Sequence, residues 1–146
     1  MGETKTGRCL CGAVQVEVTD LPREISACFC DLCTRWGGGV QMGIETPADR
    51  VHVTGPLKTH RSSKLAERAW CDRCGSSVWL RDVDEFDTGH IELCPGLFEN
   101  AGDARLTRVV YADRAPEGYS LAGDYERVSQ TEYEAVNPHL NEEPTP

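Results

Sequence analysis

The sequence predicts a single, mainly β domain in which cysteine-bearing turns join short strands. Short runs that alternate apolar and polar residues, closed by glycine or proline, dominate the chain, and long helical periodicity is absent. The 146 residues suffice for one domain with its own core and are too few for two comfortable ones. Eight cysteines, most of them at short spacings, indicate metal ligands or redox thiols.

The expected strands follow one another closely along the chain. Val14, Val16 and Val18 alternate with polar residues, which predicts a strand with one buried face. Further strands are expected over 40–45, 66–70, 77–80, 88–93 and 108–111. Residues 51–53 and 57–60 flank the turn Thr54-Gly55-Pro56 as a hairpin would.

Loops and one short helix complete the predicted domain. The run Gly37-Gly38-Gly39 is expected to be a loop or a tight backbone approach. The segment Thr131-Glu132-Tyr133-Glu134 fits a capping box, which predicts a short helix near the C-terminus. We place the domain at residues 1–136 and expect the polar, acidic tail at 137–146 to be disordered.

Charge and compartment narrow the choice of partners. The formal net charge of −9 disfavours nucleic acid and anionic membrane surfaces, because both reward clustered lysine and arginine. Neither an apolar signal segment nor a run of membrane-spanning length is evident, so we expect a cytoplasmic protein. In a reducing compartment, closely spaced cysteines act as metal ligands or redox thiols and not as a disulfide framework.

Seven cysteines fall into three groups: the pair Cys9 and Cys11, the triplet Cys28, Cys30 and Cys33, and the pair Cys71 and Cys74. Zinc holds sulfur at about 2.3 Å, so closely spaced cysteines share one ion only where the backbone bends sharply. A glycine, which accepts the positive φ of such a bend, follows each outer pair but not the triplet. We therefore expect the outer pairs to form a closed, structural four-sulfur zinc site. The triplet would form a second site with an open position.

The chemistry of a three-thiolate zinc site favours thiol substrates. Thiolates donate charge strongly, so such an ion is a weak Lewis acid and a poor generator of hydroxide. It is better suited to binding and deprotonating another thiol. This pattern indicates a reaction that makes or breaks a C–S bond, for example between a thiol and an aldehyde.

Three motifs resemble the signatures of the glutathione-dependent formaldehyde-activating family, also called GFA or CENP-V/GFA. They are Cys9-Leu10-Cys11-Gly12, Cys28-Phe29-Cys30-Asp31-Leu32-Cys33-Thr34-Arg35 and Cys71-Asp72-Arg73-Cys74-Gly75-Ser76. The resemblance implies a β-tent fold and two zinc ions per chain, on the outer pairs and on the triplet. It also implies a carbon–sulfur lyase that condenses formaldehyde with glutathione to S-(hydroxymethyl)glutathione. The surroundings of the triplet, including Trp36, are not a close copy of the founding enzymes.

Several residues near these motifs have a functional and an ordinary interpretation. Cys94 is either a fourth ligand that closes the triplet site or a free, partly buried thiol. Arg35 could offset charge beside the triplet or bind a substrate carboxylate, or be solvated. His90 is a candidate acid or base, Trp36 a candidate pocket wall, and Ser62 and Ser63 either line the site or form a turn.

Three functions remain open at this point. The first is a zinc-dependent carbon–sulfur lyase acting on glutathione-like adducts of formaldehyde or a related aldehyde, with Cys28, Cys30 and Cys33 as catalytic zinc ligands and Arg35 beside them. The second is a non-catalytic zinc module that binds a protein partner. The third is a redox or metal-buffering protein, since a three-thiolate site releases zinc when it is oxidised.

Overall fold

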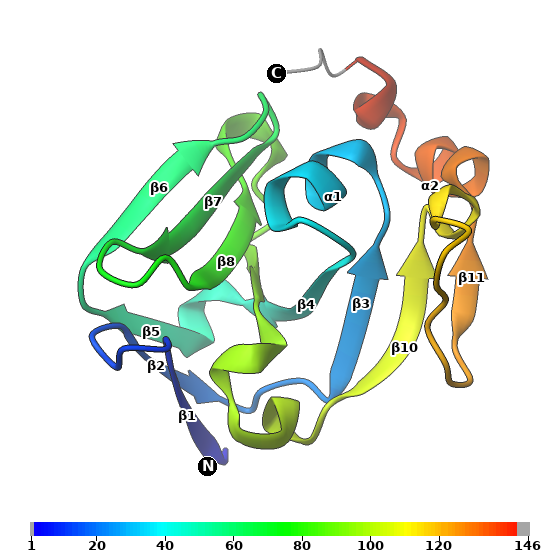
Figure 1. Cartoon of the computed structure of the whole chain (residues 1–146). Helices are drawn as coiled ribbons and strands as arrows, with labels where there is room; N and C mark the ends of the chain where they lie inside the picture. The colour runs from blue at the N-terminus through cyan, green and yellow to red at the C-terminus, as the bar shows by residue number, and fades with distance from the viewer. Residues whose placement is uncertain (1, 143–146) are drawn as a thin grey trace.

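Two β-sheets form the framework of this computed structural model, which describes residues 2–142 (Figure 1). The smaller sheet has the strand order β1-β2-β5, and the larger has the order β11-β10-β3-β4-β9-β8-β7-β6. The strands are β1 Thr4–Arg8, β2 Gln15–Thr19, β3 Glu24–Cys28, β4 Gln41–Pro47, β5 Val51–Thr54, β6 Leu57–Arg61, β7 Ala66–Cys71, β8 Ser77–Asp82, β9 His90–Leu93, β10 Arg105–Val110 and β11 Glu126–Val128. The predicted mainly β class is confirmed.

The small sheet packs its valine face into the main core. Val16 and Val18 of β2 are buried and Gln15 and Glu17 are exposed, as their alternation predicts. These valines and Val14 share a hydrophobic cluster with large-sheet residues that include Ile44, Val78 and Leu93. Apolar burial between the sheets therefore holds one against the other.

The predicted hairpin over 51–53 and 57–60 is not formed, because its two halves belong to different sheets. β5 pairs with β2, whereas β6 pairs with β7. The turn between them carries the chain from the small sheet to the large one. The alternation of these segments was interpreted correctly as strand, but their partners depend on tertiary packing.

The large sheet is antiparallel except around β10, which runs parallel to both β3 and β11. Figure 1 shows β6, β7 and β8 on one side and β3, β10 and β11 on the other, with β4 between them. A second cluster, including Ala27, Phe29, Val109 and Val128, supports the β3–β10–β11 side. The specific β-tent assignment stays a prediction.

The α-helices are α1 (Asp31–Gly37) and α2 (Gln130–Val136). The expected loop at residues 37–39 begins one residue late, because Gly37 ends α1 and Gly38 caps it. The predicted helix near the C-terminus is present as α2, but its capping box uses Ser129 and Glu132 instead of Thr131 and Glu134. No helix in the described range is long and apolar enough to cross a membrane.

Short 3-10 helices fill several connections: Ala48–Arg50, Asp84–Phe86, Pro95–Leu97, Glu99–Asp103, Ala112–Arg114 and Pro138–Glu142. The last one lies within the tail at 137–146, and the disorder expected of that tail stays a prediction. Residues 143–146 of that tail lie outside the described residues. The domain boundary at residue 136 stays a prediction.

Candidate metal centres and the cavity beside them

Two tight β-turns bring the outer cysteine pairs together. Cys9 and Cys11 lie on the β1–β2 connection, and Cys71 and Cys74 lie on the β7–β8 connection. The sulfurs of all four residues are within 4.8 Å of one another. The Sγ atoms of Cys9 and Cys11 are 3.6 Å apart, and those of Cys11 and Cys71 are 3.8 Å apart. This cluster could hold a metal ion.

The glycine after each outer pair has the backbone conformation that the sequence predicts. Gly12 and Gly75 adopt φ values of +82° and +79°. Each closes its turn by donating its N–H to the carbonyl of the first cysteine, at 3.2 Å to Cys9 and 2.8 Å to Cys71. A side chain would strain this conformation, so glycine is the residue that suits both turns.

The four-cysteine cluster connects the two sheets. β1 and β2 belong to the small sheet, and β7 and β8 belong to the large one. The Leu10 N–H also donates to Ser76 Oγ at 3.0 Å across the same junction. Cys9 and Cys71 are buried, with 2% and 0% of their surface exposed. An ion held here would therefore cross-link the two sheets, and its four sulfur ligands would leave no open position.

The triplet is shaped in a different way, by the end of a strand and the start of a helix. Cys28 is the last residue of β3, Cys30 is the N-cap of α1, and Cys33 lies in the first helical turn. The backbone N–H of Cys33 donates to Cys30 Sγ, and the N–H of Cys30 donates to Cys28 Sγ, both at 3.4 Å. The three sulfurs lie within 4.8 Å of one another and could hold a metal ion.

The sulfurs of the triplet do not share protons equally. Hydrogen bonds from the thiols of Cys28 and Cys33 lower the pKa of Cys30 to about 3, despite partial burial. The hydrogen bond with Cys30 in turn raises the pKa of Cys28. These hydrogen bonds therefore favour the thiolate form of Cys30, which is the form that binds metal.

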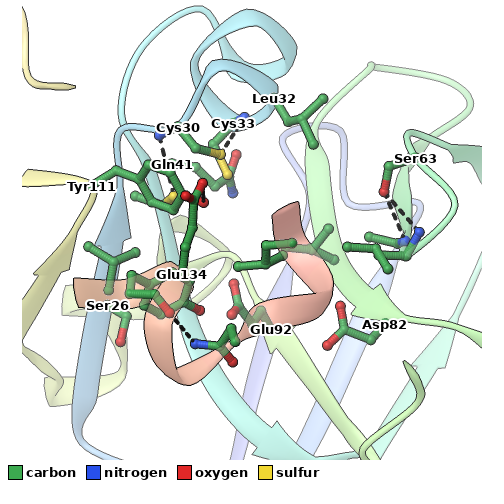
Figure 2. A pocket seen from close by; sticks show the side chains of 18 of the residues that line it. Ser26, Cys30, Leu32, Cys33, Gln41, Ser63, Asp82, Glu92, Tyr111 and Glu134 are labelled. Carbon is green, nitrogen blue, oxygen red and sulfur yellow. Dashed lines mark hydrogen bonds between the residues drawn. The ribbon is translucent and has the colours of Figure 1, made fainter. Parts of the chain in front are cut away.

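A cavity of about 660 Å³ opens beside the triplet (Figure 2). Its walls come from α1, from strands of the large sheet, and from α2 with the segment that follows it. Figure 2 shows Cys30 and Cys33 on one side of this space, with Asp82 and Glu92 across from them. Of the two clusters, only the triplet lines this cavity.

The arginine next to the triplet is Arg68 of β7, which the sequence analysis did not single out. It is only 4% exposed, and its guanidinium donates to Cys33 Sγ at 3.7 Å and to Ser62 Oγ at 3.0 Å. Arg35, the predicted neighbour, lies exposed in the last turn of α1. Sequence proximity favoured Arg35, whereas a sheet brings Arg68 from 35 positions away.

Cys94 is not part of the triplet cluster in the described structure. Its sulfur lies 4.0 Å from the Nε2 of Gln41 and faces a second, shallower hollow shared with Thr6 and Phe98. Burial raises the pKa of its thiol. Among the described residues, the triplet cluster therefore consists of three cysteines, and the role of Cys94 as a free thiol stays a prediction.

The remaining candidates are divided between the site and the surface. Ser63 lines the cavity, and its Oγ accepts from the N–H groups of Leu65 and Ala66, so both interpretations of this serine apply. Trp36 does not line the cavity: its ring is stacked on His60 at 5.6 Å and lies 5.8 Å from the guanidinium carbon of Arg68, which does line it. His90 is exposed, with Nδ1 at 3.0 Å from the Thr88 carbonyl.

Comparison with known proteins places these clusters in a family. The model of the glutathione-dependent formaldehyde-activating enzyme family matches residues 4–114, which include both clusters and Cys94. The chain belongs to this family. The predicted membership is thereby confirmed. The match ends before α2, so the C-terminal wall of the cavity lies outside the matched region.

Two curated relatives agree with this family. A Halomonas elongata protein that carries the family's name is 33% identical over 86 residues, covering 52% of this chain and 55% of its own length. An uncharacterized lyase from Schizosaccharomyces pombe is 28% identical over 117 residues, covering 80% of this chain and 84% of its own. These names agree with the predicted lyase class of enzyme.

A solved structure shares the fold. The crystal structure of a Rhodobacter sphaeroides protein aligns with a TM-score of 0.51 and 16% sequence identity. The alignment covers 84% of this chain and 99% of the other. At this identity the likeness concerns the backbone arrangement alone.

Proposed function

We propose that this chain is a zinc-dependent carbon–sulfur lyase. Its substrates would be a small thiol such as glutathione and formaldehyde or a related small aldehyde. The observation that carries this proposal is the triplet, whose three sulfurs cluster at a cavity of about 660 Å³ without a fourth cysteine. Family membership supports the same chemistry.

The donor atoms fit two zinc ions per chain. Tetrahedral zinc with bonds of about 2.3 Å places its sulfurs about 3.8 Å apart. The sulfur–sulfur separations of 3.6 and 3.8 Å among Cys9, Cys11 and Cys71 agree with this spacing. We assign the structural zinc to these three residues with Cys74, and the second zinc to Cys28, Cys30 and Cys33. Zinc bound at an open, thiolate-rich site would lower the pKa of a thiol that joins it.

The residues around the triplet supply the rest of the site. Arg68 balances part of the negative charge of the thiolates, and its burial keeps that charge effective. Arg108 and Arg114 line the same cavity and offer guanidinium groups to the carboxylates of a glutathione-like thiol. Arg114 is already paired with Asp31 at 3.0 Å, whereas the pair of Arg108 with Glu126 is 3.9 Å long. Arg108 is therefore the stronger candidate for substrate binding.

The alternative of a non-catalytic zinc module explains the four-cysteine cluster equally well. It gives no reason for a second cluster that lines a cavity together with the buried Arg68 and several carboxylates. Cavities of several hundred Å³ with a few convergent polar groups are typical of small-molecule sites. The cavity therefore favours the enzyme over the interaction module. Both remain compatible with a cytoplasmic protein that binds neither nucleic acid nor membrane.

Metal counting combined with added glutathione tests this function. We expect two zinc ions per chain and, after cobalt substitution, a change in the thiolate-to-cobalt absorption when glutathione is added. The protein should also speed the formation and breakdown of S-(hydroxymethyl)glutathione. The Cys33→Ser variant is the matched control, because it should keep one metal and lose both responses.

Two results would count against the proposal. A cobalt spectrum that glutathione leaves unchanged, together with no lyase activity, would favour the interaction module. Formaldehyde consumption that does not depend on any thiol would rule out the thiol-adduct reaction specifically. In both cases the count of two metals would stand, so the metal assignment and the reaction are tested separately.

A further inference from the structure

A row of paired residues crosses four strands beneath the cavity. Arg68 of β7 is opposite Leu80 of β8, Leu80 is opposite Glu92 of β9, and Glu92 is opposite Glu45 of β4. Residues directly opposite each other in antiparallel strands project from the same face of a sheet. All four line the cavity. Glu92 thus lies on the cavity floor, across from the triplet (Figure 2).

The local packing presses the Glu92 side chain against the sheet. Its strand neighbours Ile91 and Leu93 are buried on the opposite face, in the main core. A Cβ atom at Gly43 would lie 2.8 Å from Glu92 Oε2 and 3.1 Å from Glu92 Cβ, so the carboxylate occupies space that any larger residue would take. Among residues 2–140, whose side chains the structure describes, none donates a hydrogen bond to this carboxylate or forms an ion pair with it.

Ionisable groups on the strands and helices around the cavity affect the pKa of Glu92. Burial, followed by the carboxylates of Glu45 and Asp82, raises its pKa to about 7. Arg68 acts in the opposite direction, and Cys30 of the triplet adds a smaller upward effect. Tyr133 of α2 also senses Glu92, and its own pKa is raised to about 12, mainly by burial. Glu92 therefore changes its charge near neutral pH, where a proton-transfer group works best.

We propose that Glu92 is the acid–base residue of the lyase reaction, an inference that rests on the proposed function. In cleavage, the Glu92 carboxylate takes the proton from the hydroxyl of the S-hydroxymethyl adduct. The C–S bond breaks, its electron pair stays on sulfur, and the C–O bond becomes the carbonyl of the released aldehyde. The new carboxyl group then gives its proton to the thiolate. Synthesis is the reverse of these steps.

Other ionisable groups at the cavity are less suited to this role. Glu134 Oε1 already accepts from the Tyr111 hydroxyl and from Gln130 Nε2, both at 3.1 Å. The ring of His139 is stacked on Phe86 at 5.6 Å. Glu45 is exposed on its strand. Glu92 is half-buried and its carboxylate accepts no hydrogen bond from the residues whose side chains are described.

The pH dependence of adduct cleavage by zinc-loaded protein tests this role. The wild-type rate should rise with pH around a midpoint near 7 and level off when Glu92 is ionised. Glu92→Gln should lower that plateau by about 10²–10⁴-fold and remove this midpoint. Glu45→Gln is the matched control: it should move the midpoint to lower pH and keep the plateau, because it removes a repelling charge without removing the base. Both variants should retain two zinc ions.

A second measurement does not depend on activity. Carbon-13 NMR of glutamate-labelled protein should show one side-chain carboxyl that titrates near pH 7, that is absent in Glu92→Gln and that shifts to lower pH in Glu45→Gln. Titration of this carboxyl at the ordinary pH of a glutamate would overturn the assignment.

The possible outcomes separate this assignment from the proposed function. If the wild type cleaves the adduct and Glu92→Gln does so equally well over the same pH range, Glu92 is not the base, and the lyase function stands. If the wild type shows no thiol-dependent lyase activity, the function fails and the role of Glu92 fails with it.

Discussion

The two cysteine clusters use the same ligand type but are built by different backbone devices. The four-cysteine cluster joins two glycine-closed turns from two sheets. The triplet is held where β3 ends and α1 begins, and its geometry depends on N–H groups that donate to sulfur. The first arrangement would give an ion four sulfur ligands at the junction of the sheets. The second leaves one side turned to a cavity.

The difference in backbone suggests a division of roles, in which the four-cysteine cluster stabilises the fold and the triplet takes part in the reaction. Burial of Cys9 and Cys71 at the junction of the sheets couples the first cluster to the core. The triplet lies at the edge of the second, smaller core and shares its cavity with charged side chains. Loss of the four-cysteine cluster should therefore unfold the protein. Loss of the triplet should abolish its activity and leave it folded.

The largest expected effect is that of Cys71→Ser. This sulfur is fully buried and would be one of four zinc ligands, and structural zinc contributes on the order of 10 kcal/mol of apparent binding free energy. That is comparable with the whole stability of a domain. We expect loss of the cooperative unfolding transition in circular dichroism. A soluble, fully folded Cys71→Ser protein with both metals bound would refute the structural assignment.

Cys33→Ser should spare the fold and remove the chemistry. We expect the zinc content to fall from two ions to one, with unchanged far-UV circular dichroism and no measurable lyase activity. Cys94→Ser is the matched control, since that sulfur lies outside the triplet cluster and should be dispensable for both metals. Loss of a zinc ion from Cys94→Ser would show instead that Cys94 completes the second site.

Arg68→Met should have an intermediate effect, confined to the triplet. A hydrogen bond to a charged group contributes about 1.5–3 kcal/mol, so the zinc of the triplet should exchange roughly ten- to a hundredfold more readily with a chelator. The four-cysteine site should not respond. Arg35→Met serves as the control, because its side chain is exposed on α1. Equal effects of the two substitutions would contradict the role given to Arg68.

The cysteine clusters were predictable because their signals are local. Spacing and the glycine after each outer pair identified which cysteines meet and where the backbone turns. The valine alternation around Val16 likewise identified a buried strand face. The sequence analysis did not predict helix α1, because a helix of seven residues shows little hydrophobic periodicity. Its N-cap is Cys30, a residue type that is not a typical N-cap signal.

The cavity could not be predicted because it depends on pairing between distant strands. Arg68 and Glu92 occupy ordinary strand positions, and only the register of β7, β8 and β9 aligns them on one face. In the sequence, the weak signal for Glu92 was a glutamate that stands between the apolar residues Ile91 and Leu93 of an expected strand. The hairpin predicted around Gly55 was wrong for the same reason, because alternation of apolar and polar residues identifies a strand but not the strand that pairs with it.

The smallest effect concerns the turn that distinguishes the four-cysteine cluster from the triplet. Gly75→Ala forces a side chain into a left-handed conformation at φ +79°, where it meets no atom within 4 Å. The cost should therefore be backbone strain alone, about 1 kcal/mol in the free energy of unfolding. Gly89→Ala has the same kind of strain at φ +76°, also without a clash, and Gly89 does not adjoin a residue of either cysteine cluster. Denaturant unfolding should show similar losses for both variants, whereas only Gly75→Ala should speed zinc release to a chelator. Equal rates of release would mean that the turn contributes to the fold but not to the geometry of the four sulfurs.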